Sequence, residues 1–220
     1  MKFNIFLKLI LLLSCIIFFI ATNSLSTTAF LKEGLSGNNN IVLIGDSMLN
    51  NFNYVQQSIP ELLKLKTPNV FNFATDGSII ADCYAQLDKI PNRLNAQTTY
   101  VFISAGGNDI LNARGQLDND AIKQLFTKYI TLIKSIKTKL PSVNVNVLNL
   151  YLPTNPQYQS YTTSINLWNK LIQTNSSKIG EMYNVIDTNK LLTSATDFVY
   201  DIEPSESGGE KIATAIYLSL

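Results

Sequence analysis

Three short segments of the chain carry polar groups suited to acyl transfer. Ser47 supplies a hydroxyl directly after Gly45-Asp46, Gly77 supplies a backbone N–H in a polar turn, and Asn108 supplies a side-chain amide after two glycines. Attack of a hydroxyl on a carbonyl needs a nucleophile and hydrogen-bond donors aimed at the oxyanion that develops. Ser47 is therefore a candidate nucleophile, and Gly77 and Asn108 are candidate oxyanion donors.

Ser47 taken alone also fits a purely structural role. The run Ile41-Val42-Leu43-Ile44 is typical of a buried strand, and Gly45 is the residue best able to take a strained turn after it. Asp46 and Ser47 are both good helix N-caps. A strand, a turn and the start of a helix would then explain these residues without any catalytic role. The catalytic interpretation of Ser47 therefore depends on the other segments.

Strands and helices alternate along the chain after residue 40. Apolar runs predict strands at 41–44, 69–74, 99–104, 143–151 and 184–186, and periodicity predicts helices at 53–66, 79–90, 118–140, 161–182 and 205–220. This alternation predicts an α/β fold, a three-layer αβα sandwich with a five-stranded parallel sheet in flavodoxin-like order. The loops that carry Ser47, Gly77 and Asn108 would then lie at one edge of the sheet.

Composition narrows the chemistry further. The 220 residues carry a net charge of +1, which gives no argument for binding nucleic acid. The two cysteines, Cys15 and Cys83, cannot form a disulfide framework. The chain has no histidine, which excludes a histidine general base and a Cys/His zinc site.

The N-terminal segment has the pattern of an export signal. Lys2 and Lys8 precede an apolar stretch at 9–21 that is shorter than the roughly 20 residues of a membrane span. We predict a signal peptide or signal anchor at 1–30, a linker at 31–40 and one domain at 41–220. The protein is then exported, either secreted or anchored in the membrane by this segment alone.

The motifs together resemble the SGNH (GDSL-type) hydrolase superfamily of esterases, lipases and acetylhydrolases, over nearly all of the chain after the leader. The resemblance rests on Gly45-Asp46-Ser47, Asn72 to Gly77, Gly106-Gly107-Asn108-Asp109, and Asp201-Ile202-Glu203-Pro204-Ser205. It implies an SGNH hydrolase topology with Ser47 as nucleophile. It also implies an oxyanion hole from the N–H groups of Ser47 and Gly77 and the Asn108 side chain, and Asp201 as the residue that orients the base.

One position departs from the family pattern. The catalytic histidine of the family falls on Glu203, with Asp201 upstream and Pro204-Ser205 downstream fixing the register. An ionised glutamate can accept the Ser47 proton, although its usual pKa of about 4.3 makes it a weaker base than histidine at about 6.5. Asp201 and Glu203 would also place two carboxylates at one site, and we expect them to titrate as a coupled pair.

These observations lead to two functional hypotheses. The first is a hydrolase that cleaves a small-molecule or glycan ester through an acyl-enzyme on Ser47, with Glu203 as base and no cofactor or metal. The second is a catalytically inactive, exported domain that keeps the pocket and binds an acyl or glycan ligand. A carboxylate metal site formed by Asp46, Asp201, Glu203 and Glu206 is a minor alternative, because their spacing matches no known cation-binding loop.

Overall fold

Five parallel strands form the central sheet of the protein, in the order β2-β1-β3-β4-β5. The computed structural model describes residues 39–114, 117–176 and 184–220, so the expected leader at 1–30 lies outside the described residues. The strands are β1 (Asn40–Gly45), β2 (Val70–Asn72), β3 (Thr99–Ser104), β4 (Asn144–Leu148) and β5 (Asn184–Ile186). This is the order of a flavodoxin-like sheet, so the predicted fold class is confirmed.

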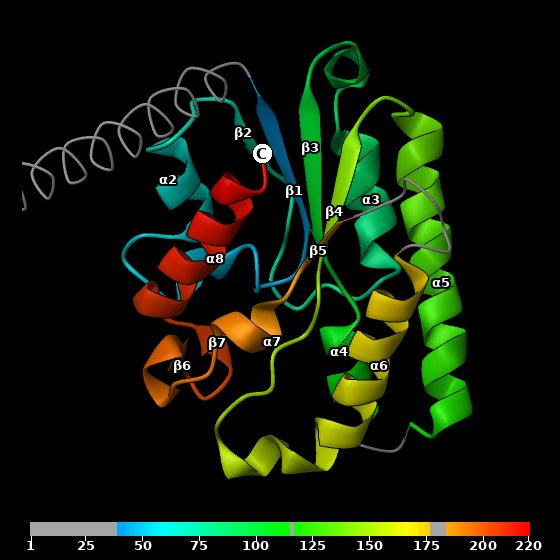
Figure 1. Cartoon of the computed structure of the whole chain (residues 1–220), viewed down its shortest axis with the longest axis vertical. Coiled ribbons are helices and arrows are strands. Elements are labelled where there is room, and N and C mark those ends of the chain that lie inside the picture. Colours follow the sequence, from blue (N-terminus) through cyan, green and yellow to red (C-terminus); the bar gives the residue numbers. More distant parts are fainter. Residues whose placement is uncertain (1–38, 115–116, 177–183) are drawn as a thin grey trace, which may run out of the picture. The chain divides into compact units, whose positions relative to one another are not determined.

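Helices cover both faces of the sheet (Figure 1). The helices are α2 (Ile59–Lys64), α3 (Asp82–Lys89), α4 (Gly107–Asn112), α5 (Asn119–Lys139), α6 (Thr162–Asn175), α7 (Thr188–Leu191) and α8 (Glu206–Leu218). Helices α2 and α8 lie on one face and α3, α5 and α6 on the other. Right-handed crossovers explain this division, because the chain steps one way from β1 to β2 and the other way from β2 to β3, β4 and β5.

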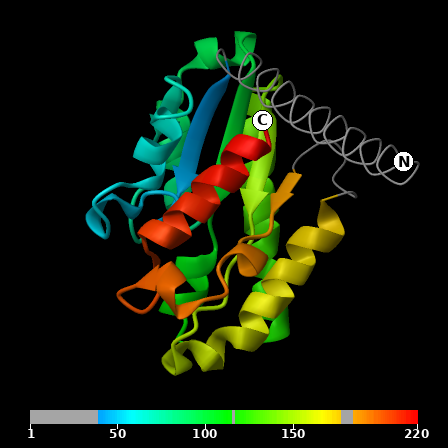
Figure 2. The same cartoon turned by 60° about the vertical axis from the view of Figure 1, so that its left-hand side comes forward.

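The carboxyl ends of the strands all point to one edge, at the bottom of Figure 1. Helices α4 and α7 and a two-stranded antiparallel hairpin, β6 (Phe198–Val199) and β7 (Glu203–Pro204), lie at this edge. Figure 2 shows α8 crossing one face of the sheet above this hairpin. Four short 3-10 helices complete the described chain: η1 (Asn51–Asn53), η2 (Asn92–Ala96), η3 (Pro156–Tyr161) and η4 (Ala195–Asp197).

Most element bounds agree with the sequence pattern, and the differences have local causes. The helix predicted at 53–66 begins only at Ile59, because Ser58 and Glu61 form a capping box and Pro60 occupies the first turn. The strand predicted at 143–151 ends at Leu148, where the chain turns away over the edge of the sheet. The last turns of the helix predicted at 161–182 fall largely on residues that the structure does not describe.

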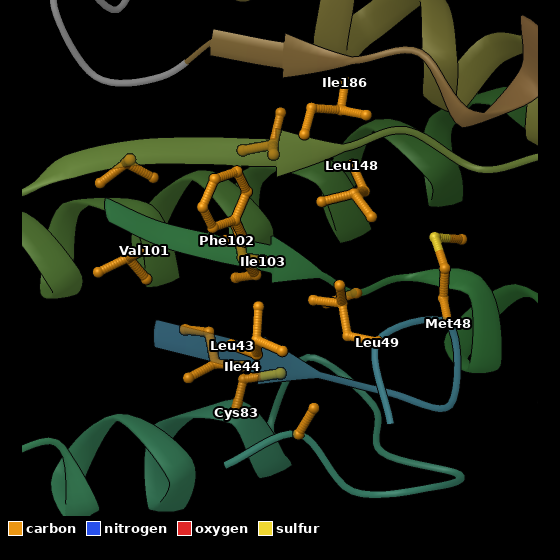
Figure 3. Close-up of a cluster of buried hydrophobic side chains, with 14 of the residues drawn as sticks. Leu43, Ile44, Met48, Leu49, Cys83, Val101, Phe102, Ile103, Leu148 and Ile186 are labelled. Atoms are coloured by element: carbon orange, nitrogen blue, oxygen red, sulfur yellow. The ribbon is translucent and has the colours of Figure 1, made fainter. Parts of the chain in front are cut away.

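Strand β1 is the centre of the hydrophobic core, and all six of its residues are buried. It pairs residue for residue with β3, from Asn40 opposite Thr99 to Gly45 opposite Ser104. Figure 3 shows side chains of β1 and β3 packed with others from β4 and β5. Gly45 has φ 131°, and a Cβ there would lie 1.9 Å from the carbonyl oxygen of Ser104. Only glycine lets β1 end this close to β3.

Within the described residues, no helix is both long and apolar enough to cross a membrane.

Candidate active site

Ser47 lies in a turn directly after β1, at the edge where the strands end. The carbonyl of Asp46 accepts the N–H groups of Leu49 and Asn50, both at 3.1 Å, which closes a single helical turn. The chain then passes into η1, so the expectation that Ser47 opens a regular helix is wrong. The turn leaves Ser47 partly exposed at the mouth of a cavity.

A buried glutamine of α3 holds the end of β1 in place. The Gln86 side chain accepts the N–H of Gly45 at 2.6 Å and donates to the carbonyl of Gly45 at 2.9 Å. It also donates to the hydroxyl of Ser78 at 3.0 Å. One side chain therefore fixes both the residue that precedes the Asp46-Ser47 turn and the loop that follows β2.

Asn108 stands in the first turn of α4, directly after β3. Its side-chain nitrogen donates to the carbonyl of Ser78 at 3.0 Å, and the carboxylate of Asp109 accepts the N–H of Ile80 at 3.0 Å. These bonds tie the β3 loop to the β2 loop. Because an amide nitrogen carries two protons, the second N–H of Asn108 is left for a ligand in the cavity that Asn108 lines.

Glu203, in β7, lines the same cavity as Ser47 and Asn108. Burial raises the pKa of its carboxyl above the usual range, a hydrogen bond from Ser47 lowers it, and the charge of Asp76 raises it. One carboxylate oxygen, Oε2, is buried and has no hydrogen-bond partner among the described residues. Glu203 therefore presents a carboxylate to Ser47 that is more basic than an exposed glutamate.

Asp201 is not placed to orient Glu203 in this structure. Its two oxygens accept hydrogen bonds from the side chains of Asn155, at 2.7 Å, and Gln157, at 3.2 Å, and the residue is exposed. Tyr200 and Asp201 both have positive φ, 48° and 69°, in the loop of the β6–β7 hairpin. The expected pairing of Asp201 with Glu203 is therefore not formed, because the hairpin directs the Asp201 side chain towards η3.

Glu203 interacts electrostatically with two other carboxylates, Asp76 and Asp46. Asp76 contributes to the raised pKa of Glu203, and it is held by the side-chain amides of Asn50, at 2.9 Å, and Asn53, at 2.7 Å. Asp46 is 4% exposed, and burial raises its pKa to about 7, with a smaller contribution from the charge of Glu203. The hydroxyl of Ser104 donates to Asp46, which partly offsets that burial.

Gly77 follows Asp76 in the β2 loop, exposed and with φ 73°. The residues that line the cavity include Ser47, Asn108 and Glu203 but neither Gly77 nor Asp201. Of the five predicted site residues, three thus surround one cavity and two stand outside it. Among the described residues, no cluster of three or more metal-ligating side chains is formed, so the alternative carboxylate metal site is not assembled.

The cavity itself is small and mostly apolar. Its volume is about 70 Å³, and beyond the polar groups at its mouth it is walled by aliphatic and aromatic side chains from α4, the loop after β4, and α6. The hydroxyl of Tyr151, one of these residues, donates to the carbonyl of Ile202 at 2.7 Å. This bond joins the cavity wall to the residue next to Glu203.

The sequence patterns did not single out Gln86, Asp76, Ser104 or Tyr151. Each acts through a partner far away in the chain, such as Gly45 for Gln86 and Asp46 for Ser104. A glutamine inside a helix or a tyrosine after a strand carries no local signal of such a contact. The sequence suggests Asp46 as a helix cap or a metal ligand, whereas its burial beside Ser47 is the stronger feature of the structure.

Solved structures with the same fold are numerous, and three illustrate the range. A lipase from a goat rumen metagenome has a TM-score of 0.66 at 19% identity, covering 83% of this chain and 97% of that one. A member of the lipolytic G-D-S-L family from Veillonella parvula has a TM-score of 0.65 at 18% identity, covering 83% and 97%. An acetyl xylan esterase has a TM-score of 0.59 at 13% identity, covering 82% and 99%.

At these identities the likeness to solved structures establishes the fold alone. No curated protein matches the sequence significantly. The model of the GDSL-like lipase/acylhydrolase family, however, matches residues 26–213, which is most of the chain. The segments that contain Ser47, Gly77, Asn108 and Glu203 all fall within that range. The protein therefore belongs to the GDSL-like lipase/acylhydrolase family of hydrolases.

Proposed function

We propose that the protein hydrolyses an ester or O-acyl bond through an acyl-enzyme on Ser47, with Glu203 as the general base. One observation carries the proposal: a single cavity is lined by a serine hydroxyl, an asparagine amide and a carboxylate that accepts from that serine. This is a nucleophile, an oxyanion donor and a base within reach of one bound carbonyl.

The steps follow from these positions. The Oγ atom of Ser47 attacks the carbonyl carbon of the ester while its proton passes to the Glu203 carboxylate. The resulting oxyanion is held by the free N–H of Asn108 and by the backbone N–H of Ser47, both at residues that line the cavity. When the intermediate collapses, the bond to the alcohol oxygen breaks and the protonated Glu203 gives its proton to that oxygen.

Deacylation repeats the sequence with water. Glu203 takes a proton from the attacking water, the bond from the acyl carbon to the Ser47 oxygen breaks, and the proton returns to Ser47. The raised pKa of Glu203 suits both directions, because a base works best when its pKa approaches the working pH. Activity then falls as the pH drops through that raised pKa, since the protonated carboxyl cannot accept the serine proton.

The experiment combines labelling with turnover on the full chain. A fluorophosphonate probe should label wild type but not Ser47→Ala, and short aryl esters should be hydrolysed by wild type only. Ser142→Ala is the matched control, because Ser142 is an exposed serine before β4, at the opposite edge of the sheet. Ester hydrolysis that survives Ser47→Ala contradicts the proposal.

A non-catalytic acyl- or glycan-binding domain is the second candidate function. The observation in its favour is that Oε2 of Glu203 is buried without a partner and that the Asp201 carboxylate is bound elsewhere. A base without an orienting group is held less firmly for proton transfer. Ligand binding in the cavity, without probe labelling or turnover, is the result that favours this function.

A further inference from the structure

The cavity beside Ser47 is a partly open pocket whose inner walls are apolar side chains. It is lined beyond Ser47 by Leu111, Leu150, Tyr151 and Ile165, among others, and its volume is about 70 Å³. Leu150, Tyr151 and Ile165 are each less than one-tenth exposed. The space next to the nucleophile is therefore an apolar pocket rather than an open face.

The volume sets a limit on what the pocket holds. An apolar cavity of roughly 150 Å³ takes benzene, which has six non-hydrogen atoms, and a single water needs about 10–15 Å³. Scaled from benzene, a cavity of about 70 Å³ holds about three non-hydrogen atoms, and scaled from water it holds about five to seven, so we take about three to five as its capacity. An acetyl, propionyl or butyryl group has this size, and a fatty acyl chain does not.

The wall from the loop after β4 is held by several hydrogen bonds. Asn169 of α6 accepts the N–H of Leu150 at 2.8 Å and donates to its carbonyl at 2.6 Å. The side chain of Asn189 accepts the N–H of Leu152 at 3.1 Å, and Tyr151 donates to Ile202 at 2.7 Å. Widening the pocket on this side requires breaking these bonds, each of which leaves a desolvated polar group.

We propose that this cavity is the acyl pocket and that it selects short, uncharged acyl groups of about two to four carbons. The effect of this selection on turnover rests on the proposed ester hydrolysis at Ser47. The preference of the pocket for short groups in binding does not. A charged acyl group is disfavoured because the walls offer aliphatic and aromatic surface, while the Glu203 carboxylate beside Ser47 repels an anion.

Ile165 is the side chain chosen to test the limit. It projects from α6 into the pocket and is 6% exposed, so Ile165→Ala removes wall without adding charge. Ile172 is fully buried on the same helix and is not among the lining residues. Ile172→Ala is therefore the matched control for the stability lost on truncating a buried isoleucine.

The experiment has two arms on the full chain. In the first, kcat/KM for p-nitrophenyl esters should fall by about 10-fold or more between butyrate and octanoate, and Ile165→Ala should reduce this difference while Ile172→Ala should not. In the second, binding of ethyl propionate and ethyl octanoate to Ser47→Ala is followed by NMR, and the propionate ester should bind in the pocket more tightly.

The two arms separate this proposal from the proposed function. Equal or better binding of the octanoate ester by Ser47→Ala overturns the short-acyl pocket, whether or not the wild type is an enzyme. Preferred binding of the propionate ester supports the pocket even if no Ser47-dependent turnover is found. If Ile165→Ala folds poorly, Ile165→Val should shift the chain-length preference in the same direction by a smaller factor.

Discussion

At the scale of single residues, the two carboxylates suggested by the C-terminal motif have different surroundings. Glu203 lines the cavity with Ser47, whereas Asp201 accepts hydrogen bonds from Asn155 and Gln157 and is exposed. The sequence predicted one coupled pair of carboxylates, with Glu203 as the base and Asp201 as the residue that orients it. The structure separates them, so their substitutions should have unequal effects.

Substitution of Glu203 should abolish most turnover, while substitution of Asp201 should not. Glu203→Gln removes the carboxylate that accepts from Ser47, and kcat/KM should fall by about 10²–10⁴-fold. Asp201→Asn keeps a hydrogen-bonding oxygen in the hairpin loop and should cost far less. Glu210→Gln, at an exposed position of α8, controls for loss of charge. A larger loss in Asp201→Asn than in Glu203→Gln would restore Asp201 to a catalytic role.

Asp46 makes the stability of the protein depend on pH. Its pKa rises from 3.8 to about 7 on folding, chiefly through burial, so the unfolded chain releases this proton at lower pH than the folded one. The neutral carboxyl stabilises the fold fully below pH 3.8, and this contribution is lost as the pH rises through about 7.

Asp46→Asn should remove this dependence. The amide keeps an oxygen for the Ser104 hydroxyl but carries no charge, so the variant should gain stability over wild type at about pH 8, by up to about 4 kcal/mol, and little at about pH 4. Urea unfolding at both pH values measures the difference. An equal change at the two pH values would show that Asp46 is ionised in neither case or in both.

At the scale of elements, side chains from one element hold the ends of others. Gln86 of α3 bonds the end of β1 and the β2 loop, Asn108 and Asp109 of α4 bond the same loop, and Tyr151 bonds the hairpin. The three loops around Ser47 are thus joined into one frame. In a site built this way, the side chains are in position before a ligand arrives.

Gln86→Ala should loosen this frame. The change leaves the buried N–H of Gly45 without its Gln86 acceptor, so we expect a loss of about 1–3 kcal/mol in unfolding free energy. It should also slow fluorophosphonate labelling of Ser47, because the turn after Gly45 is no longer fixed. Gln124→Ala, at an exposed site on α5, is the control. If Gln86→Ala is destabilised but Ser47 is labelled at the wild-type rate, Gln86 stabilises the fold without positioning Ser47.

At the scale of the whole molecule, the end of β1 contributes both to the packing of the sheet and to the position of Ser47. Gly45 closes the central strand against Ser104 of β3, and Asp46 and Ser47 follow at once. A fully buried strand therefore places Ser47 at the edge where the other loops converge.

Gly45→Ala should be among the most damaging single substitutions. Its Cβ would lie 1.9 Å from the backbone oxygen of Ser104, at the ends of two paired, buried strands, so we expect a cost above about 3 kcal/mol. Gly77→Ala also has positive φ but meets nothing within 4 Å, and should cost about 1–2 kcal/mol. Thermal unfolding compares the two directly. Similar losses of unfolding free energy in the two variants would mean that β1 and β3 move apart to make room for the added Cβ.

The sequence by itself determined the alternation of strands and helices, the αβα fold, and the positions of Ser47, Asn108 and Glu203 near the strand ends. These follow from local periodicity and from the motifs. Only the tertiary structure decided that Asp201 turns away, that Asp46 is buried beside Ser47, that Gln86 fixes Gly45, and how large the pocket is. Such features depend on contacts between residues distant in the chain, and on burial, which no local pattern encodes.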